Sequence, residues 1–209
     1  MSHGTPAHAT VPARPGRTSI FAFDGMNHHI LAMWTFISSE VFFFGALIGV
    51  FIVYRGSIGA GPAPGEVLDV LRTAIFTVFL LASSVTVGLA GARLHHGDQT
   101  GFKLWLVVTL VLGAIFLVGQ VTEYAALYGE GLTLSHSLFF ASFYLLTGFH
   151  GLHVFSGLIA LAILTGLALA GDFRGGRDTA LESIALYWHF VDVVWIVVFS
   201  VVYLWSLFG

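Results

Sequence analysis

The chain has 209 residues, of which 57% are hydrophobic and only 9% are charged, and its mean hydropathy is +0.91. Because an ordinary soluble domain carries about 25% charged residues, this composition excludes a protein whose whole surface faces water. The net charge of −3 argues against a nucleic-acid-binding protein. The absence of cysteine excludes disulfides, iron–sulfur clusters and thiolate metal sites on this chain.

Residues 1–27 form the first segment, which is polar and rich in proline, alanine and glycine. This segment lacks the charged start and the short apolar core of a signal peptide. We therefore expect a polar cytoplasmic N-terminal tail, followed by a transmembrane domain over residues 28–209.

Five apolar stretches follow the tail, at about residues 30–54, 73–92, 104–122, 137–170 and 183–208. Each is long enough to cross a bilayer, which takes roughly 20 apolar residues. Buried helices of soluble proteins are shorter and amphipathic, whereas these stretches are apolar on every side. The sequence thus predicts an all-α membrane protein, a bundle of five transmembrane helices. The fourth stretch is longer than a bilayer requires, so we expect it to tilt or to project beyond the membrane.

Lysine and arginine are unevenly distributed between the two ends of the predicted helices. The tail and the second and fourth connections hold most of them, namely Arg14, Arg17, Arg93, Lys103, Arg174 and Arg177. Only Arg55 and Arg72 lie on the other side. Because cytoplasmic loops are enriched in these residues, we predict that the N-terminus is cytoplasmic and the C-terminus is outside.

Small residues recur at spacings that allow helices to approach closely in a membrane. Gly45 and Gly49 form a G-x-x-x-G pattern in the first stretch. Similar sets occur in the second and fourth stretches: Ser84, Gly88 and Ala92, and then Gly148, Gly151 and Gly157. These positions predict a compact bundle.

Glu40 and Asp192 lie at membrane depth, where a charged side chain costs on the order of 2.5–3.5 kcal/mol. Counted from the helix ends, their depths are similar, which favours a contact of Glu40 with Asp192 or with the nearby His189. Two interpretations of Glu40 stay open. Either it handles protons or forms a regulated contact, or it is a neutral acid that is hydrogen-bonded to a neighbouring helix.

His150 and His153 lie three residues apart on one predicted helix face, and this spacing suits metal ligation. Glu123 lies at a matching depth near the outer face. Because no third or fourth ligand stands out, we favour a hydrogen-bond network between Glu123 and these histidines over a metal site. A haem held by two histidines also fits poorly, since the histidines at positions 28–29 lie at the inner edge and those at positions 95–96 lie in a loop. These residues do not by themselves indicate a reaction.

Several segments together carry a resemblance to a known family. They are residues 37–44 (ISSEVFFF), 80–84 (LLASS), Gln120 with Glu123-Tyr124, 147–154 (TGFHGLHV) and 187–195 (YWHFVDVVW). In these segments the chain resembles subunit III of cytochrome c oxidase and of its quinol-oxidase relatives. The last two segments are the most specific, because membrane helices rarely carry such polar strings.

The resemblance implies an accessory subunit of a proton-pumping haem-copper terminal oxidase in aerobic respiratory electron transport. In that family, subunit III carries no haem or copper, and dioxygen is reduced to water on subunit I. The resemblance therefore implies no catalytic, cofactor-binding or metal-binding residue on this chain. Subunit III packs against subunit I in a complex that also holds subunit II and a small subunit IV. It holds structural phospholipid between its helices and supports proton uptake. Cytochrome c is the expected electron donor, with quinol as the alternative.

The resemblance also implies roles for single residues. Glu40 falls on the family's buried membrane glutamate. The other family polar positions, of largely structural character, are Glu123, His150, His153, Glu182, His189 and Asp192. The chain resembles the short bacterial form, which lacks the first two helices of longer relatives, and a bacterial plasma membrane is therefore implied.

Two other functions are compatible with the residues alone. A proton or ion transporter would use Glu40 and Asp192, although no internal repeat supports this function. A membrane oxidoreductase with its own metal or haem would use His150 and His153.

Overall fold

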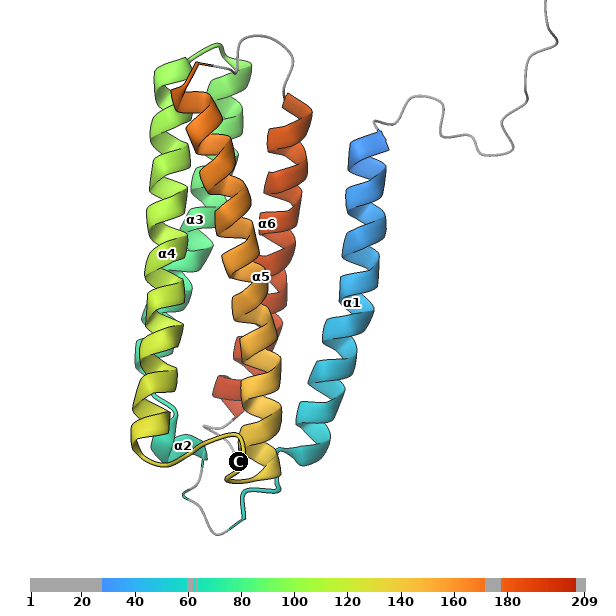
Figure 1. The fold of residues 1–209 in the computed structure, drawn as a ribbon, viewed down its shortest axis with the longest axis vertical. Coiled ribbons are helices and arrows are strands. Elements are labelled where there is room, and N and C mark those ends of the chain that lie inside the picture. Colours follow the sequence, from blue (N-terminus) through green and yellow to red (C-terminus); the bar gives the residue numbers. More distant parts are fainter. Residues whose placement is uncertain (1–27, 60–61, 63, 172–177, 206–209) are drawn as a thin grey trace, which may run out of the picture.

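The structure is a computed structural model, and it describes residues 28–59, 62, 64–171 and 178–205. The predicted tail, residues 1–27, therefore lies outside the described residues. The described helices are α1 (His28–Tyr54), α2 (Pro64–Val67), α3 (Val70–His95), α4 (Gln99–Gly129), α5 (Leu138–Leu169) and α6 (Asp178–Phe199). A short π-helix, η1 (Ser200–Leu204), continues α6 (Figure 1).

Five helices, α1, α3, α4, α5 and α6 with its π-helical end, are long and apolar enough to cross a membrane. The predicted fold class, an all-α bundle of five transmembrane helices, is thus confirmed. The exterior suits this setting, because large apolar side chains such as Phe42 and Val53 are 80% and 72% exposed. Hydrocarbon, and not water, is the solvent that such a surface requires.

The helices α3 and α4 begin before the apolar stretches from which they were predicted, because polar residues cap them. The side chain of Asp69 accepts a hydrogen bond from the backbone N–H of Arg72 at 2.9 Å, and that of Asp98 accepts one from Gly101 at 2.9 Å. Such caps satisfy backbone donors that have no partner inside the helix. Hydropathy alone therefore predicts which part of a helix crosses the membrane, but it does not predict where the helix begins and ends.

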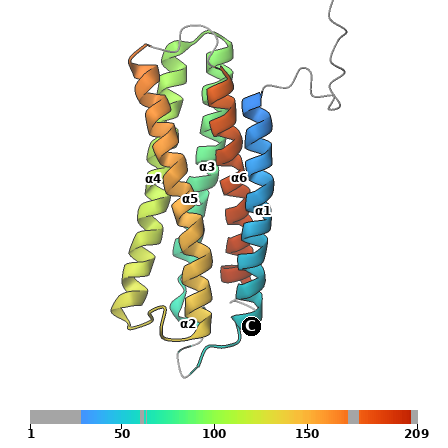
Figure 2. The ribbon, with the colours of Figure 1, turned by 45° about the vertical axis from the view of Figure 1, so that its right-hand side comes forward.

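The helices α3, α4, α5 and α6 run alongside one another, and α1 packs mainly against α5 and α6 (Figures 1 and 2). In its most apolar segment α1 has 17% of its residues buried, against 33% in each of the other spans. It is thus the least enclosed helix. Figure 1 also shows that α1 begins well below the upper ends of α3, α4 and α5. We call the lower end of the bundle in this view, where α2 lies, the α2 end.

Aromatic rings fill the core, and glycines make room for them. Trp188 is fully buried between α4 and α5. A Cβ atom at either Gly113 or Gly157 would stand 2.8 Å from its indole ring, and one at Gly151 would stand 2.8 Å from Oε1 of Gln120. The close packing predicted for the glycines of α5 is therefore present at Gly151 and Gly157.

The glycines of α1 behave differently. A Cβ atom at Gly45 or Gly49 would have no neighbour within 4 Å, and the same holds for Gly88 of α3. The prediction that these three positions bring helices of this bundle together was wrong, since the small-residue pattern of α1 faces away from the described helices.

Candidate functional site

The polar string of α6, residues 187–195, attaches this helix to α3. Three side-chain contacts join the two helices: Trp188 Nε1 donates to Ser83 Oγ at 2.9 Å, Trp195 Nε1 donates to Thr77 Oγ1 at 2.8 Å, and Ser84 Oγ lies 2.5 Å from Nδ1 of His189. Lipid gives helices no hydrophobic reason to associate, so hydrogen bonds of this kind contribute to their packing. Much of the string thus has a structural explanation.

Asp192 lies within this string, but the contacts between α6 and α3 do not explain why its carboxyl group is buried. The residue is 3% exposed, and neither carboxyl oxygen has a hydrogen-bond partner among the described residues. Ser84 is near enough to interact with the carboxyl group, but its hydroxyl lies 2.5 Å from His189. Because burying a carboxyl group without a hydrogen bond costs free energy, contacts within the described chain do not account for this residue.

Glu40 of α1 and His153 of α5 form a polar side-chain pair between these two helices. Nε2 of His153 lies 3.2 Å from Oε2 of Glu40, and the two side chains are 15% and 17% exposed. The tyrosine hydroxyl of Tyr187 on α6 donates to the backbone oxygen of His153 at 2.9 Å. Three helices therefore meet at this point.

The hydrogen bonds of His153 limit where a proton can reside. Its Nδ1 lies 2.8 Å from the backbone oxygen of Phe149, which only accepts hydrogen bonds, so Nδ1 carries a hydrogen. Nε2 then either accepts a hydrogen bond from protonated Glu40 or, when protonated, donates one to the carboxylate. The pair can thus hold one proton on either partner without a change of geometry.

A groove with a volume of about 750 Å³ opens beside this pair, between α1 and α5. Its walls include Phe36, Phe43 and Phe149, and Ser39 and Ser156 add hydroxyl groups near the pair. The groove makes Glu40 accessible from outside the bundle, whereas Asp192 and His150 are enclosed.

His150 has a different environment from His153, although the two lie on the same helix. It is fully buried, and neither ring nitrogen has a hydrogen-bond partner among the described residues. Its ring stacks on Trp195 with centroids 4.7 Å apart, and Phe44 and Phe116 approach it edge-on. Across the described chain, no group of three or more histidine, aspartate and glutamate side chains is arranged to hold a metal ion.

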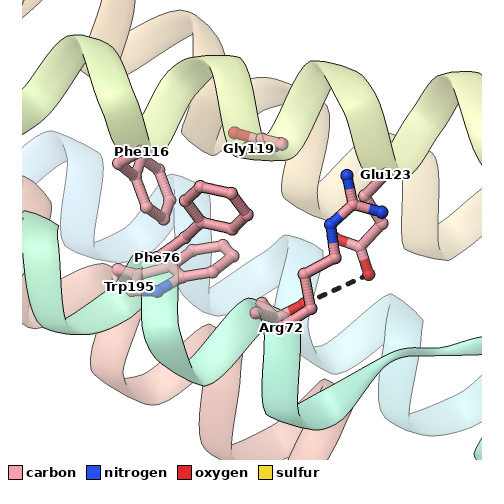
Figure 3. A pocket seen from close by; sticks show the side chains of 8 residues that line it. Arg72, Phe76, Phe116, Gly119, Glu123 and Trp195 are labelled. Atoms are coloured by element: carbon pink, nitrogen blue, oxygen red, sulfur yellow. Dashed lines mark hydrogen bonds between the residues drawn. The ribbon is translucent and has the colours of Figure 1, made fainter.

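Glu123 lies near the α2 end and pairs with hydroxyl groups. Tyr203 donates to its Oε2 at 2.9 Å, and Thr73 donates to its Oε1 at 3.3 Å, the bond drawn in Figure 3. A hole of about 10 Å³, lined by Phe76, Phe116 and Gln120 among others, adjoins the carboxyl group. Tyr203 belongs to the π-helix η1.

The contacts predicted for the two glutamates were wrong. Glu40 meets His153 and not Asp192 or His189, and Glu123 meets Tyr203 and Thr73 and not a histidine. Depths had been counted from the helix ends, but α1 begins lower than its neighbours (Figure 1). Equal counts along two helices therefore do not mean equal depths.

Sequence reasoning also missed a row of hydroxyl side chains on α3, which meet Glu123, Trp195 and His189. A detectable signal existed, because these residues, Thr73, Thr77 and Ser84, are spaced by four and seven residues and so lie on one helix face. Glu182, also singled out from the sequence, lies exposed near the start of α6.

Comparison with known proteins points in one direction. A family model described as cytochrome c oxidase subunit III matches residues 14–207. A "Cytochrome bo(3) ubiquinol oxidase subunit 3" of Pseudomonas putida is 36% identical over 175 residues, which is 84% of this chain and 84% of the relative. A "Quinol oxidase subunit 3" of Bacillus subtilis is 36% identical over 184 residues, 87% of this chain and 89% of the relative. A "Cytochrome c oxidase subunit 3" of Thermostichus vulcanus is 33% identical over 188 residues, 90% of this chain and 92% of the relative.

The match spans the α5 segment with His150 and His153 and the polar string of α6, the two segments on which the resemblance chiefly depends. It also spans all five helices that are able to cross a membrane. The chain therefore belongs to the cytochrome c oxidase subunit III family.

Proposed function

We propose that this chain is the accessory subunit III of a proton-pumping haem-copper terminal oxidase in a bacterial plasma membrane. It stabilises subunit I, in a complex that also contains subunit II and a small subunit IV, and it supports proton uptake there. The observation that carries this proposal is the family match over residues 14–207. The relatives named above include both cytochrome c and quinol oxidases, and we favour cytochrome c as the electron donor of this complex.

The haems and copper of the complex are proposed to lie on partner subunits. The environments of the two histidines on α5 support this part of the proposal. His153 already binds Glu40 and a backbone oxygen, and His150 is enclosed by aromatic rings with no carboxylate among its described contacts. A metal would require further ligands to converge on one of them.

The pair of Glu40 and His153 is proposed to connect the subunit to proton movement or to a regulated contact. Its accessibility from the groove and its ability to keep one proton on either partner support this role. Asp192 is proposed to serve assembly, because its enclosed carboxyl group has no hydrogen-bond partner among the described residues and the cost of burying it is not offset there. Structural phospholipid is proposed to occupy the groove beside Glu40.

Affinity purification tests the function directly. The chain is tagged at its N-terminus, the membranes are solubilised in mild detergent, and co-purifying proteins are identified by mass spectrometry. We expect a large haem-bearing subunit and a copper-binding partner, whose donor site distinguishes cytochrome c from quinol. Recovery of the chain alone, stable and without haem, would overturn the proposal and favour the transporter that uses Glu40 and Asp192.

A further inference from the structure

One polar side chain of α6 faces out of the bundle at membrane depth. His189 is exposed, as is Val193 one turn further along the helix. It lies ten residues after Thr179, where the span begins, and fifteen residues before Leu204, where the span ends. These intervals are helical rises of about 15 Å and 22 Å, and a hydrocarbon core is about 30 Å thick. His189 therefore lies within the core wherever the core falls along this span.

Lipid is a poor neighbour for an imidazole ring at this depth. Hydrocarbon offers neither a donor nor an acceptor, and ionisable side chains inside membranes almost always face protein or a water-filled cavity. Nδ1 of His189 lies 2.5 Å from Oγ of Ser84 on α3, but Nε2 has no hydrogen-bond partner among the described residues. This face therefore requires a cover that brings a polar protein side chain to Nε2.

The hydroxyl group of Ser84 is close to two polar groups of α6. His189 and Asp192 are three residues apart and so are neighbours on one helix face, and Ser84 is near enough to interact with the carboxyl group of Asp192 as well as with Nδ1. A serine hydroxyl has only one hydrogen to donate. Neither carboxyl oxygen of Asp192 has a hydrogen-bond partner among the described residues, so the hydrogen of Ser84 is the one that this carboxyl group lacks.

The tautomer of His189 decides which group receives that hydrogen. With the ring hydrogen on Nε2, Nδ1 accepts from the Ser84 hydroxyl, and no donor is left for Asp192. With the ring hydrogen on Nδ1, the ring donates to Oγ of Ser84, and the hydroxyl hydrogen is free to turn to Asp192. A neighbour that donates to Nε2 fixes the second tautomer, because Nε2 must then accept.

We propose that the α3–α6 seam, defined by Ser84, His189 and Asp192, is the docking surface for subunit I, which donates a hydrogen bond to Nε2. This contact directs the Ser84 hydroxyl to Asp192, so that assembly offsets the cost of the buried carboxyl group. The matching chemistry on subunit I is a hydroxyl, amide or indole donor, because an acceptor would fix the tautomer that leaves Asp192 without a hydrogen bond. The inference rests on the proposed function, which supplies subunit I as the partner.

Site-specific photo-crosslinking tests the docking surface. Benzoylphenylalanine is placed at Val193, one turn from His189, in cells that assemble the whole complex, and the products are identified by mass spectrometry after irradiation and purification. We expect a crosslink to subunit I. The matched control is Val111 of α4, which is 53% exposed against 59% for Val193 and should not give this product.

Substitutions at Ser84 test the hydrogen-bond switch. Ser84→Ala should lower the recovery of subunit I with the tagged chain on the order of tenfold, because Asp192 then gains no donor on assembly. Ser84→Thr, which keeps the hydroxyl group, should restore recovery. Infrared spectra of the purified complex, wild type minus Asp192→Asn, isolate the carboxyl bands of Asp192, and Ser84→Ala should shift these bands. Ser200→Ala is the matched control, since the Ser200 hydroxyl donates to Ile196 of its own helix.

A double substitution shows whether Ser84 acts through Asp192. In a chain that already carries Asp192→Leu, Ser84→Ala should cause no further loss of recovery. Additive losses, or carboxyl bands that Ser84→Ala leaves unchanged, would overturn the switch. In an intact complex, a crosslink from Val193 to lipid, to a second copy or to another subunit, or none at all, would overturn the docking surface. Each result is read in a complex that contains the haem-bearing subunit, so none of them contradicts the proposed oxidase function, which fails only if the chain is recovered alone.

Discussion

The polar residues at membrane depth differ in whether contacts within the described chain offset the cost of burying them. Glu123 has two hydroxyl donors, and His189 has a serine. Glu40 has a histidine partner, since Nε2 of His153 lies 3.2 Å from its Oε2. Asp192 has no hydrogen bond from the described residues. Glu40 and Asp192 are therefore the residues at which substitutions best distinguish a structural role from a functional one.

For Glu40 we expect Glu40→Ala to shorten the working life of the oxidase complex several-fold while the initial rate of oxygen reduction stays close to wild type. The physical reason is that Glu40 lies at the α1–α5 groove and pairs with His153, and the described residues form no metal site beside it. Oxygen consumption followed to inactivation measures both quantities. Ser38→Ala is the control, because the Ser38 hydroxyl is exposed and bonds only to its own helix at Trp34. An immediate and total loss of oxygen reduction in an intact, haem-loaded complex would contradict the prediction.

For Asp192 we expect opposite effects on the isolated chain and on the complex. Asp192→Leu replaces an unpartnered buried carboxyl group with an apolar side chain, which should stabilise the isolated chain by about 1–3 kcal/mol. The same change should weaken association with the other subunits, because assembly of the complex is proposed to offset the cost of this buried carboxyl group. Thermal unfolding of the chain in detergent and subunit recovery on purification provide the two readouts. If the complex is recovered unchanged, Asp192 has no role in assembly.

At the scale of helices, the contact between α3 and α6 depends on side chains of matched size and polarity. Trp188 and Trp195 are large, and each donates one hydrogen bond to a small hydroxyl residue of α3. Glycines on α4 and α5 leave room for the indole of Trp188 from the other side. The π-helix at the end of α6 carries Tyr203, which donates to Glu123. Because the indole of Trp188 is held on both sides, it has little freedom to yield to a larger neighbour.

This rigidity predicts the effect of one added methyl group. Gly157→Ala would place a Cβ atom 2.8 Å from the indole of Trp188, and overpacking of this kind costs about 1–3 kcal/mol. We expect a lower unfolding temperature in detergent. Gly166→Ala on the same helix is the matched control, because its Cβ atom would have no neighbour within 4 Å. Similar unfolding temperatures for the two variants would show that the packing around Trp188 is looser than described.

At the scale of the whole molecule, the charged residues at the two ends of the bundle predict its orientation. The connection between α3 and α4 belongs to the lysine- and arginine-rich side, and there Arg93 and Asp98 form a salt bridge of 3.3 Å. The α2 end has only Arg55 and Arg72. From the positive-inside rule we therefore predict that the α2 end lies outside the cell.

The absence of cysteine makes this orientation straightforward to measure. Ser57→Cys and His96→Cys each introduce one thiol at an exposed position, at the α2 end and at the opposite end respectively. In intact spheroplasts a membrane-impermeant maleimide should label the first variant, and it should label the second only after the membrane is opened. The reverse pattern would place the N-terminus outside.

The sequence by itself determined the five transmembrane helices, since apolar stretches that are long enough to span a bilayer have few alternatives to a helix in lipid. It also determined the family, because the strings at residues 147–154 and 187–195 are specific. The residues of interest were chosen from their cost at membrane depth, and their roles stay predictions. Only the tertiary structure decided which partners they have.

The physical reason is that contacts between helices depend on the rotation and the vertical offset of each helix. Neither quantity follows from counting residues from a helix end, as the low start of α1 shows for Glu40 and His153. The pairing of Glu123 with Tyr203 likewise involves a π-helical turn that no pattern in the sequence predicted. The sequence therefore determines which residues are costly in a membrane, and the packing of the helices determines what offsets that cost.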